Sequence, residues 1–517
     1  MSNVKALIVG VSDYTLIEEK NLPFCRNDIT IMQNALENGL KVETNNLIIC
    51  GKNAVVTESD FINALNNFAR IATVDDTVIF YFSGHGTTQL SNHYLVFSDK
   101  IISTQEIIGF IQKIKAKNKI IILDSCMSGN FAIDSTAAFN IGETVDEFAG
   151  KGYAVLASSN AVQYSYAHPD KPVSLYTSFL CEALEDKHII RDGKKSLYDI
   201  NRLVSLYLEI WNKRNQSKQQ QPIFRANIGG TIFFNVEEYV PYIQKNIFDD
   251  TEKYTVYDVK PVHSIAKRYS VSVILKEPFS FDEMSDISVE IIEKIKKVEV
   301  YSNVASEKRW IGQDANIIWI YYGRDESDII NSNYICHTTW VDDEQDKQHW
   351  YPLDQNSFIK KNIHFNIHSY YELLKDFNLK NTGDRNKLLF DGTEIMRRLI
   401  MLAEKAIALY NELKNQNITE DVMIQKMKIL IPMITEAYFG VSNLNIAPDE
   451  LHNWKQGILN LAATIHDFTY FYNSDFILQR TPENRLACMD MTIIRYYNEL
   501  EQLKSLENDI VTYYQNN

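Results

Sequence analysis

Two short apolar runs in the first third of the chain each lead directly into a small, polar and chemically reactive segment. Residues 78–82 precede Ser-Gly-His-Gly at 83–86, and residues 120–123 precede Asp-Ser-Cys-Met-Ser-Gly at 124–129. Apolar runs of this length predict strands that are buried on both faces, and the small polar residues predict a turn immediately after each strand. The pattern therefore predicts that His85 and Cys126 stand at the ends of two central strands.

The first 236 residues alternate between strand-like and helix-like patterns of hydrophobic positions. The predicted strands are 5–10, 46–50, 78–82, 94–97, 120–123 and 153–159, and 230–234 is expected to close the sheet. The predicted helices are 27–36, 57–69, 103–116, 174–184 and 197–211. Such alternation predicts an α/β fold in which a mostly parallel sheet lies between helices. Sites in these sheets form at the carboxyl edge, where His85 and Cys126 are expected.

The second half of the chain follows different patterns. Residues 254–352 mix a predicted helix at 287–297 with predicted strands at 298–301, 317–322, 334–341 and 349–353. Residues 370–514 are helical in pattern, with helices at 395–413, 423–438, 451–471 and 486–506 and no repeat period. We therefore expect three domains: an α/β domain at 1–236, a middle α+β module at 237–369 and a helical domain at 370–517.

The composition is that of a globular protein with a surplus of acidic residues. Of the 517 residues 45% are hydrophobic, and the formal net charge of −15 argues against nucleic acid as a partner. No apolar run approaches the roughly 20 residues of a membrane span, so no membrane partner is expected. The N-terminus has no signal-peptide pattern, and the six cysteines form no paired motif. A cytoplasmic, reducing location is expected, and the oligomeric state is not indicated.

A thiol beside an imidazole has a chemical meaning. The imidazole can take the proton of the thiol, and the resulting thiolate is a strong nucleophile. The backbone amides of Gly86 and Cys126 can point at a developing oxyanion. Gly86 and Gly129 leave room for a substrate backbone and accept φ values that other residues avoid. The alternative is that Cys126 is a buried small hydrophobic residue, as lone cysteines usually are.

The segments 81–86 (Tyr-Phe-Ser-Gly-His-Gly) and 124–129 resemble the two signature motifs of caspase-like cysteine peptidases, closer to the metacaspase branch than to animal caspases. The resemblance extends over residues 5–234. It implies a caspase-hemoglobinase fold, a catalytic dyad of His85 and Cys126, and peptide-bond hydrolysis. Met127 stands where metacaspases typically have His, a position without a chemical role. Abundant Asn, Ile and Lys, with only 11 Pro, suggest a bacterial source.

The resemblance also implies an acidic pocket that accepts Arg or Lys of a protein or peptide substrate. The matching positions are Cys25, Asp28, Ser83 and Asp124. Two carboxylates flanking one slot would hold a guanidinium through charge-assisted contacts. In the alternative interpretation, Asp28 is a helix N-cap and Asp124 accepts hydrogen bonds within its loop.

No cofactor is expected. Some metacaspases need calcium, but the acidic residues after the cysteine form no ordered ligand pattern: Asp134, Glu143, Asp146 and Glu147. His364 and His368 are four residues apart, yet their surroundings predict a strand, so no metal site is expected. Asp99 is expected to be structural, with a histidine-orienting role as the alternative.

The second half is expected to regulate the first. Arg324 with Trp319 or Tyr322 is the expected contact for a small-molecule or nucleotide activator, because aromatic and Arg side chains stack on planar ligands. The same aromatic residues are also typical of a sheet core, which is the interpretation that the pattern favours. The resemblance suggests a role in antiphage defence or programmed cell death. The alternative function is a non-catalytic scaffold or adaptor of the same fold that binds protein partners.

Overall fold

The computed structural model describes residues 3–89, 92–127, 154–158, 165–226, 231–239 and 247–516. For Cys126, Met127 and a few other residues it describes the backbone alone. The chain divides into two compact units, of which the first is Met1–Pro241 with Asn246–Glu372 and the second is Tyr242–Lys245 with Leu373–Asn517. The first unit contains both of the regions that the sequence pattern separates near residue 236.

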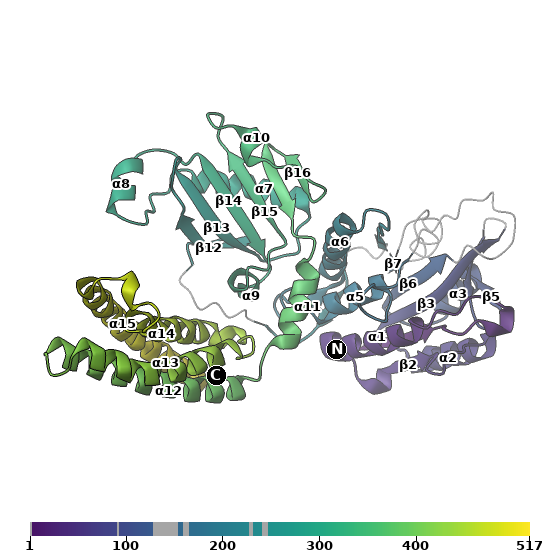
Figure 1. The fold of residues 1–517 in the computed structure, drawn as a ribbon. Helices are drawn as coiled ribbons and strands as arrows, with labels where there is room; N and C mark the ends of the chain where they lie inside the picture. Colours follow the sequence, from purple (N-terminus) through teal and green to yellow (C-terminus); the bar gives the residue numbers. More distant parts are fainter. Residues whose placement is uncertain are drawn as a thin grey trace. The chain divides into compact units, whose positions relative to one another are not determined.

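An eight-stranded sheet organises the first part of unit 1 (Figure 1). Its strands are β1 (Val4–Gly10), β2 (Leu47–Cys50), β3 (Thr77–Gln89), β4 (Asn92–Val96), β5 (Ile101–Ser103), β6 (Asn118–Met127), β7 (Ala154–Ala157) and β9 (Ile223–Ala226). The order along the main path is β2-β1-β3-β6-β7-β9, and β4 and β5 attach to the far end of β3. All neighbours on that path are parallel except β7 and β9.

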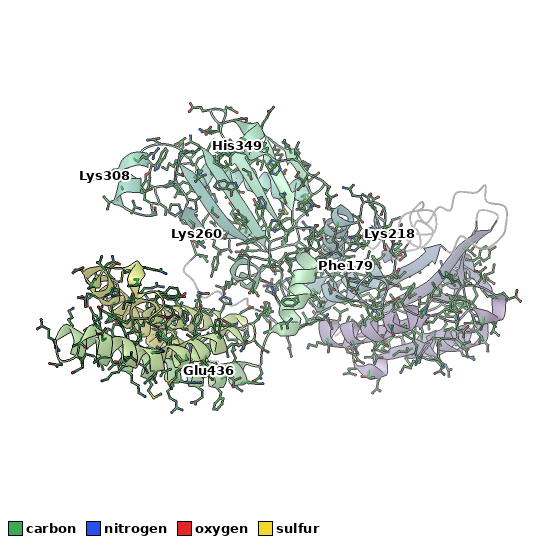
Figure 2. The ribbon with its side chains drawn as sticks, viewed as in Figure 1. Phe179, Lys218, Lys260, Lys308, His349 and Glu436 are labelled. Atoms are coloured by element: carbon green, nitrogen blue, oxygen red, sulfur yellow. The ribbon has the colours of Figure 1, made fainter. Side chains whose placement is uncertain are left out.

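Helices cover both faces of this sheet, because its central strands are apolar on both sides. The helices are α1 (Cys25–Leu40), α2 (Glu58–Ile71), α3 (Thr104–Gln112), α5 (Leu175–Glu185) and α6 (Leu197–Arg214). In β1, Leu7 and Val9 join the core formed with α2 and α3, whereas Ala6 and Ile8 join the core formed with α1, α5 and α6. Phe179 of α5 lies in the second of these cores (Figure 2).

Local sequence accounts for where several helices begin. Thr57 and Asp60 form a reciprocal capping box at the start of α2, and Ser103 and Glu106 form one at the start of α3. Such a box satisfies backbone amides that have no partner inside the helix. Asp99 also serves the start of α2, because its Oδ1 accepts a hydrogen bond from the amide of Glu58 at 2.9 Å. The structural role expected for Asp99 is confirmed.

Strands β3 and β6 do not end where the apolar runs end. They pair in parallel from Thr77 and Asn118 to Gly86 and Met127, so Ser83–Gly86 and Asp124–Met127 lie within the ladder and not in turns, whereas Ser128 and Gly129 lie outside the described residues. The antiparallel strand β4 pairs with the last part of β3. The small polar residues predicted turns. In the structure the neighbouring strands provide hydrogen-bond partners for the backbone groups of these residues, so strand pairing overrides their preference for turns.

The strand expected at 230–234 does not close the main sheet. That edge position is taken by β9, which pairs antiparallel with β7. The residues that follow form β10 (Phe233–Asn235), which pairs with β8 (Lys194–Ser196) in a separate two-stranded sheet. The prediction was wrong because the hydrophobic pattern identifies a strand and does not identify its partner.

A seven-stranded sheet forms the second part of unit 1, with the order β11-β12-β13-β14-β15-β17-β16 (Figure 1). Its strands are β11 (Asp249–Asp250), β12 (Tyr254–Pro261), β13 (Arg268–Leu275), β14 (Ile317–Gly323), β15 (Cys336–Val341), β16 (Ser357–Lys360) and β17 (Ile363–Ile367). Its helices are α7 (Phe281–Ile295), α8 (Val304–Trp310), α9 (Glu326–Ile330) and α10 (Lys347–Trp350). The next helix, α11 (Tyr371–Asn381), begins at the end of unit 1 and belongs mostly to unit 2. Two expected strands are absent: 298–301 is irregular, and α10 occupies the start of 349–353.

The two sheets of unit 1 share one continuous hydrophobic core. Residues of α5 and α6 belong to the same buried cluster as residues of β13, β14 and α7. Polar contacts cross the same boundary: Arg202 of α6 forms ion pairs with Glu277 at 3.3 Å and Glu283 at 2.7 Å. The second sheet is therefore packed directly against the helices of the first.

Unit 2 is a group of long helices with a hydrophobic core of its own. The helices are α12 (Arg385–Lys414), α13 (Glu420–Ser442), α14 (His452–Phe471) and α15 (Pro482–Asn516). On its surface, Glu436 of α13 pairs with Arg398 of α12 at 2.7 Å (Figure 2). Each helix overlaps the helical region expected from the sequence. In the part of the chain that the structure describes, no helix is long and apolar enough to span a membrane.

Candidate active site

His85 and Cys126 occupy equivalent positions on neighbouring strands. The register of β3 and β6 pairs Ser83 with Asp124, Gly84 with Ser125, and His85 with Cys126. Adjacent strands in a sheet are about 4.8 Å apart, so residues paired in this way are immediate neighbours. The structure thus brings together the two residues that the sequence predicted as a catalytic pair.

His85 is held on three sides. Its side chain is almost entirely buried, with only 2% of the residue exposed. The ring atom Nε2 lies 2.8 Å from the carbonyl oxygen of Lys20, and the backbone amide of His85 donates to Tyr14 Oη at 2.8 Å. The Tyr14 ring also packs against the imidazole, with 4.6 Å between the ring centroids. These contacts define one orientation for the imidazole.

The contact with Lys20 assigns the tautomer of the neutral imidazole. A carbonyl oxygen only accepts hydrogen bonds, so Nε2 carries the proton and Nδ1 keeps a free lone pair. Among the described atoms, the buried Nδ1 has no hydrogen-bond partner. Burial lowers the pKa of His85, and the hydrogen bond to Lys20 opposes that effect. The imidazole is thus a neutral base near pH 7 with Nδ1 ready to accept a proton.

Gly84 allows Tyr14 to approach the strand. A Cβ atom at position 84 would lie 2.6 Å from Tyr14 Oη, which is closer than atoms can pack. Gly86, by contrast, does not use the backbone freedom expected of it. The described glycines with positive φ are Gly51, Gly193 and Gly312, whereas Gly86 lies in the β3 ladder. The oxyanion role of the Gly86 and Cys126 amides stays a prediction.

Asp28 and Asp124 are both buried at the same edge of the sheet. Asp28, in the first turn of α1, is 0% exposed and accepts hydrogen bonds from Ser83 Oγ at 2.7 Å and from the Ser174 amide at 2.7 Å. Asp124, two residues before Cys126 in β6, is 1% exposed and accepts from Thr177 Oγ1 at 2.6 Å. Neither carboxylate has a cationic partner among these contacts.

The two carboxyl groups influence each other's ionisation. Burial raises the pKa of Asp28 to about 7, and the nearby Asp124 adds to the shift. Burial likewise raises the pKa of Asp124. Near neutral pH the pair therefore holds less than its full negative charge, and a cation placed between the carboxylates would restore that charge. Cys25, one turn before Asp28 on α1, is buried with them.

The raised pKa of Asp28 predicts a pH-dependent stability. Its folded-state pKa lies above the ordinary value of 3.8, so its stabilising contribution is present below about pH 4 and is lost as the pH rises through about 7. Asp28→Asn removes this loss while the Ser83 and Ser174 hydroxyls can accept from the new amide. Thermal melts at pH 5 and pH 8 should show a flatter pH dependence for the variant, with a gain at pH 8 on the order of 4 kcal/mol at most. Identical pH dependence in both proteins would contradict the assignment.

The structure does not bring the expected activator-contacting residues to one surface. Trp319 and Tyr322 lie three residues apart on β14, so they point to opposite faces of the sheet. Tyr322 is buried, and its hydroxyl lies 2.7 Å from Ser288 Oγ, while Arg324 is 1% exposed. Trp319 is half-buried beneath the Arg268 guanidinium. The expected contact of Arg324 with Trp319 or Tyr322 therefore does not lie on an exposed surface, because Arg324 and Tyr322 are both buried by packing.

The histidines of the second sheet do not form a metal centre. His364 lies in β17, as its surroundings predicted, and its Nε2 is 2.8 Å from the carbonyl oxygen of Pro352. His368 instead contacts His337, with 2.9 Å between Nε2 and Nδ1. Across the described residues no group of three or more His, Cys, Asp or Glu side chains is arranged around a possible ion. The acidic residues weighed for calcium, which fall between 134 and 147, lie outside the described residues.

Comparison with known families agrees with this geometry. Residues 3–232 match the family model described as the caspase domain, Peptidase C14. The match supports a caspase-like cysteine peptidase for the first part of unit 1 and confirms the resemblance seen in the two motifs. A search of curated proteins found no match for the chain.

Three features of the site were not apparent from the sequence. The carbonyl of Lys20 orients His85, and a backbone carbonyl has no characteristic residue type. Tyr14 is 71 residues before the amide that it contacts, and Ser174 and Thr177 reach the two carboxylates from far along the chain. The sequence signal for Ser174 and Thr177 was weak: they are hydroxyl residues at the start of the predicted helix 174–184.

Proposed function

We propose that this protein is a cysteine endopeptidase that cleaves protein or peptide chains after Arg or Lys. The observation that carries the proposal is the register of β3 and β6, which aligns His85 with Cys126 and Ser83 with Asp124. A nucleophile, its base and an acidic recognition group therefore lie within two residues of each other on adjacent strands. No described feature favours the non-catalytic scaffold.

In the proposed reaction one histidine takes up and gives back a proton in each of two stages. The Nδ1 atom of His85 takes the thiol proton as Cys126 attacks the scissile carbonyl, and the amides of Gly86 and Cys126 hold the oxyanion. The imidazolium then gives its proton to the departing amine, and the carbonyl reforms as a thioester. Water, deprotonated by the same imidazole, hydrolyses the thioester and restores the thiol. The Lys20 carbonyl keeps the ring oriented throughout.

Charge supports the proposed preference for basic residues. Asp28 and Asp124 are buried, and the hydrogen bonds that they accept from described residues come from neutral serine and threonine hydroxyls and from backbone amides. An Arg or Lys side chain between them supplies the missing positive charge in a region of low dielectric. A substrate with Asp at the same position would add a further negative charge beside the buried carboxyl groups and be excluded.

The test is a set of fluorogenic peptides that differ only at the residue before the cleaved bond. Arginine, lysine, citrulline and aspartate are compared, because citrulline matches the shape of arginine without its charge. We expect kcat/KM for arginine or lysine to exceed that for citrulline by about 100-fold or more. Preferred cleavage after aspartate would refute the proposed specificity. The absence of all cleavage, with intact folding and both with and without cell lysate added as a source of the signal, would favour the scaffold function.

We further propose that control by conformation replaces control by self-cleavage. Between Met127 and Gly150 the sequence has no Lys or Arg, and Lys151 is the first basic residue after Cys126. This segment lies largely outside the described residues, and its lack of basic residues follows from the sequence. An enzyme specific for basic residues cannot process itself there except at Lys151. Mass spectrometry should therefore find active enzyme as a single chain, and activity that depends on cuts between Met127 and Lys151 would contradict this.

The second half of the chain is the proposed regulator. A small-molecule or nucleotide signal would act by favouring the active arrangement of unit 1 through differential affinity. A role in antiphage defence or cell death is the setting that the resemblance to bacterial caspase-like proteins suggests. The shared core of the two sheets supports a direct effect of the second sheet on the site.

A further inference from the structure

Helix α5 connects the candidate pocket to the second sheet. At its N-terminal end, Ser174 donates to Asp28 through its amide and its hydroxyl, at 2.7 and 2.5 Å. Thr177, in the first turn, donates to Asp124 Oδ2 through its hydroxyl at 2.6 Å and its amide at 3.2 Å. Both pocket carboxylates therefore depend on the position of the first turn of this one helix.

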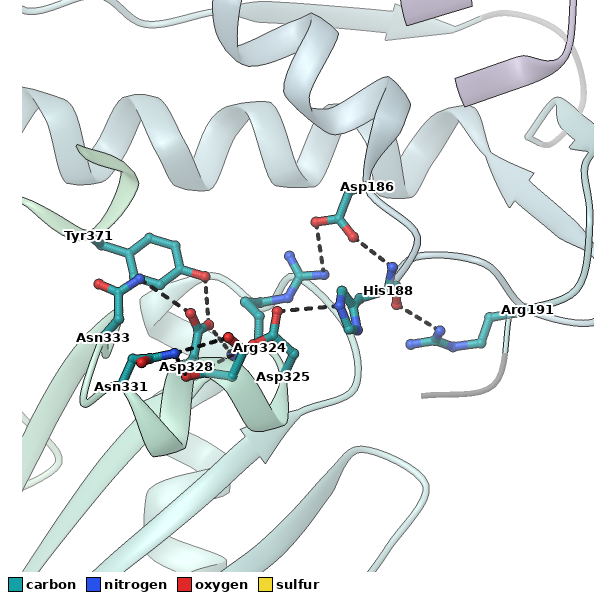
Figure 3. Close-up of polar contacts among 10 residues, drawn as sticks. Asp186, His188, Arg191, Arg324, Asp325, Asp328, Asn331, Asn333 and Tyr371 are labelled. Atoms are coloured by element: carbon teal, nitrogen blue, oxygen red, sulfur yellow. Dashed lines mark hydrogen bonds and ion pairs between the residues drawn. The ribbon is translucent and has the colours of Figure 1, made fainter. Parts of the chain in front are cut away.

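The other end of α5 contacts the second sheet through charged groups (Figure 3). Asp186 follows the helix directly and caps it, because its amide donates to the Glu182 carbonyl. Asp186 Oδ2 lies 3.8 Å from Arg324 Nη2, and His188 Nε2 lies 3.3 Å from Asp325 Oδ2. Arg324 and Asp325 come directly after β14, so they move with the second sheet.

Arg324 is an unusual residue for this position. Its guanidinium is completely buried, yet Nε, Nη1 and Nη2 make no hydrogen bond with the described residues. Its one ion pair within 4 Å among those residues is with Asp186, and at 3.8 Å that pair is long, while Asp325 adds a weaker electrostatic interaction. A buried ion pair contributes little stability, because the desolvation of its two charges offsets their attraction, and replacing the whole pair by apolar side chains is often neutral. Stability alone is therefore a poor reason for an arginine here.

The helix itself is suited to transmit a displacement. It has 11 residues, which gives a length of about 16 Å, and nine of them are buried. It also lies in close contact with α1, since a Cβ atom at Gly39 would fall 2.2 Å from the Leu184 carbonyl oxygen. A shift of α5 at Asp186 therefore moves its first turn and presses on α1, which carries Asp28.

We propose that Arg324 is a positioning residue for the Asp28–Asp124 pocket and that it acts through Asp186 and helix α5. The second sheet then determines how well the pocket accepts a basic side chain. This inference rests on the proposed Arg or Lys specificity and adds the route by which the rest of unit 1 controls it. Arg324 would therefore act by positioning helix α5, and not by contacting an activator as the sequence suggested.

The test compares Arg324→Met with Arg309→Met in the full-length protein. Arg309 is an exposed arginine of the same part of unit 1, in α8, and serves as the matched control. For arginine peptides we expect KM to rise about fivefold or more in Arg324→Met with kcat nearly unchanged, and no change in Arg309→Met. The rate of Cys126 alkylation by iodoacetamide should be equal in all three proteins. Arg324→Lys, which keeps the charge, should recover part of the loss.

A second measurement does not depend on cleavage. Hydrogen exchange followed by mass spectrometry should show faster exchange of the Ser174 and Thr177 amides in Arg324→Met, with α2 unchanged as an internal reference. If Arg324→Met folds poorly, the double variant with Asp186→Asn removes both charges and takes its place. Wild-type protein that cleaves no basic peptide would refute the proposed function. The hydrogen exchange of the Ser174 and Thr177 amides would still test the link between Arg324 and the pocket. Unchanged KM together with unchanged exchange would overturn the inference.

Discussion

Replacing Cys126 or His85 with alanine is expected to reduce peptide hydrolysis by about 1,000-fold or more. The thiol is the proposed nucleophile, and the imidazole is its base, so neither residue can act without the other. For the same reason the double variant should be no less active than either single variant. The measurement is kcat/KM for an arginine peptide, with thermal melting to show that each variant remains folded.

His85→Ala carries an additional structural consequence that the assay must separate. The imidazole packs against Tyr14 and fills a buried site, so its removal leaves a cavity that costs on the order of 2 kcal/mol of stability. Cys126→Ala removes a single sulfur atom and is the cleaner test. Cleavage by Cys126→Ala at more than a few percent of the wild-type rate would show that another residue is the nucleophile.

Asp124→Asn and Asp28→Asn are each expected to weaken cleavage after arginine by about 2–5 kcal/mol in transition-state stabilisation. The substrate cation would lose one of two buried carboxylate partners. Cleavage after citrulline should change far less, so the preference for arginine over citrulline should fall by a similar factor. Asp170→Asn, an exposed aspartate shortly before Ser174, is the matched control and should retain the preference. An unchanged preference in both pocket variants would show that the basic side chain binds elsewhere.

The Asp28 variant links this result to stability. At pH 8 it should be more stable than the wild-type protein, because it no longer forces a buried carboxyl group to ionise. It should also lose the recognition of arginine. A residue that costs stability in the free protein and contributes to substrate binding is typical of a functional site. Both effects can be measured on one purified variant.

Local patterns in the sequence were sufficient to predict the reactive residues and most elements of the first sheet. Apolar runs are buried wherever they pair, so 5–10, 46–50, 78–82 and 120–123 all overlap strands of the structure. The periodic apolar positions and the Thr57 cap likewise predicted α2 closely. The resemblance of segments 81–86 and 124–129 to the two caspase-type motifs predicted a caspase-type fold for residues 5–234. The match of residues 3–232 to the caspase-domain family model agrees with that prediction.

Partners distant in the chain were decided by the tertiary structure. The extension of β3 and β6 through His85 and Cys126 follows from pairing of the two strands, against the turn preference of their small residues. The Lys20 carbonyl has no sequence signature, and the burial of Arg324 depends on how the second sheet packs against α5 and α6. The sequence by itself predicted most of the segments that form strands and helices and which residues are the candidates for catalysis, since both follow from side-chain chemistry and local periodicity. Which carbonyl orients the histidine, which helix holds the carboxylates and which arginine reaches that helix were decided only by tertiary packing, because these contacts join residues separated by up to 146 positions in the chain.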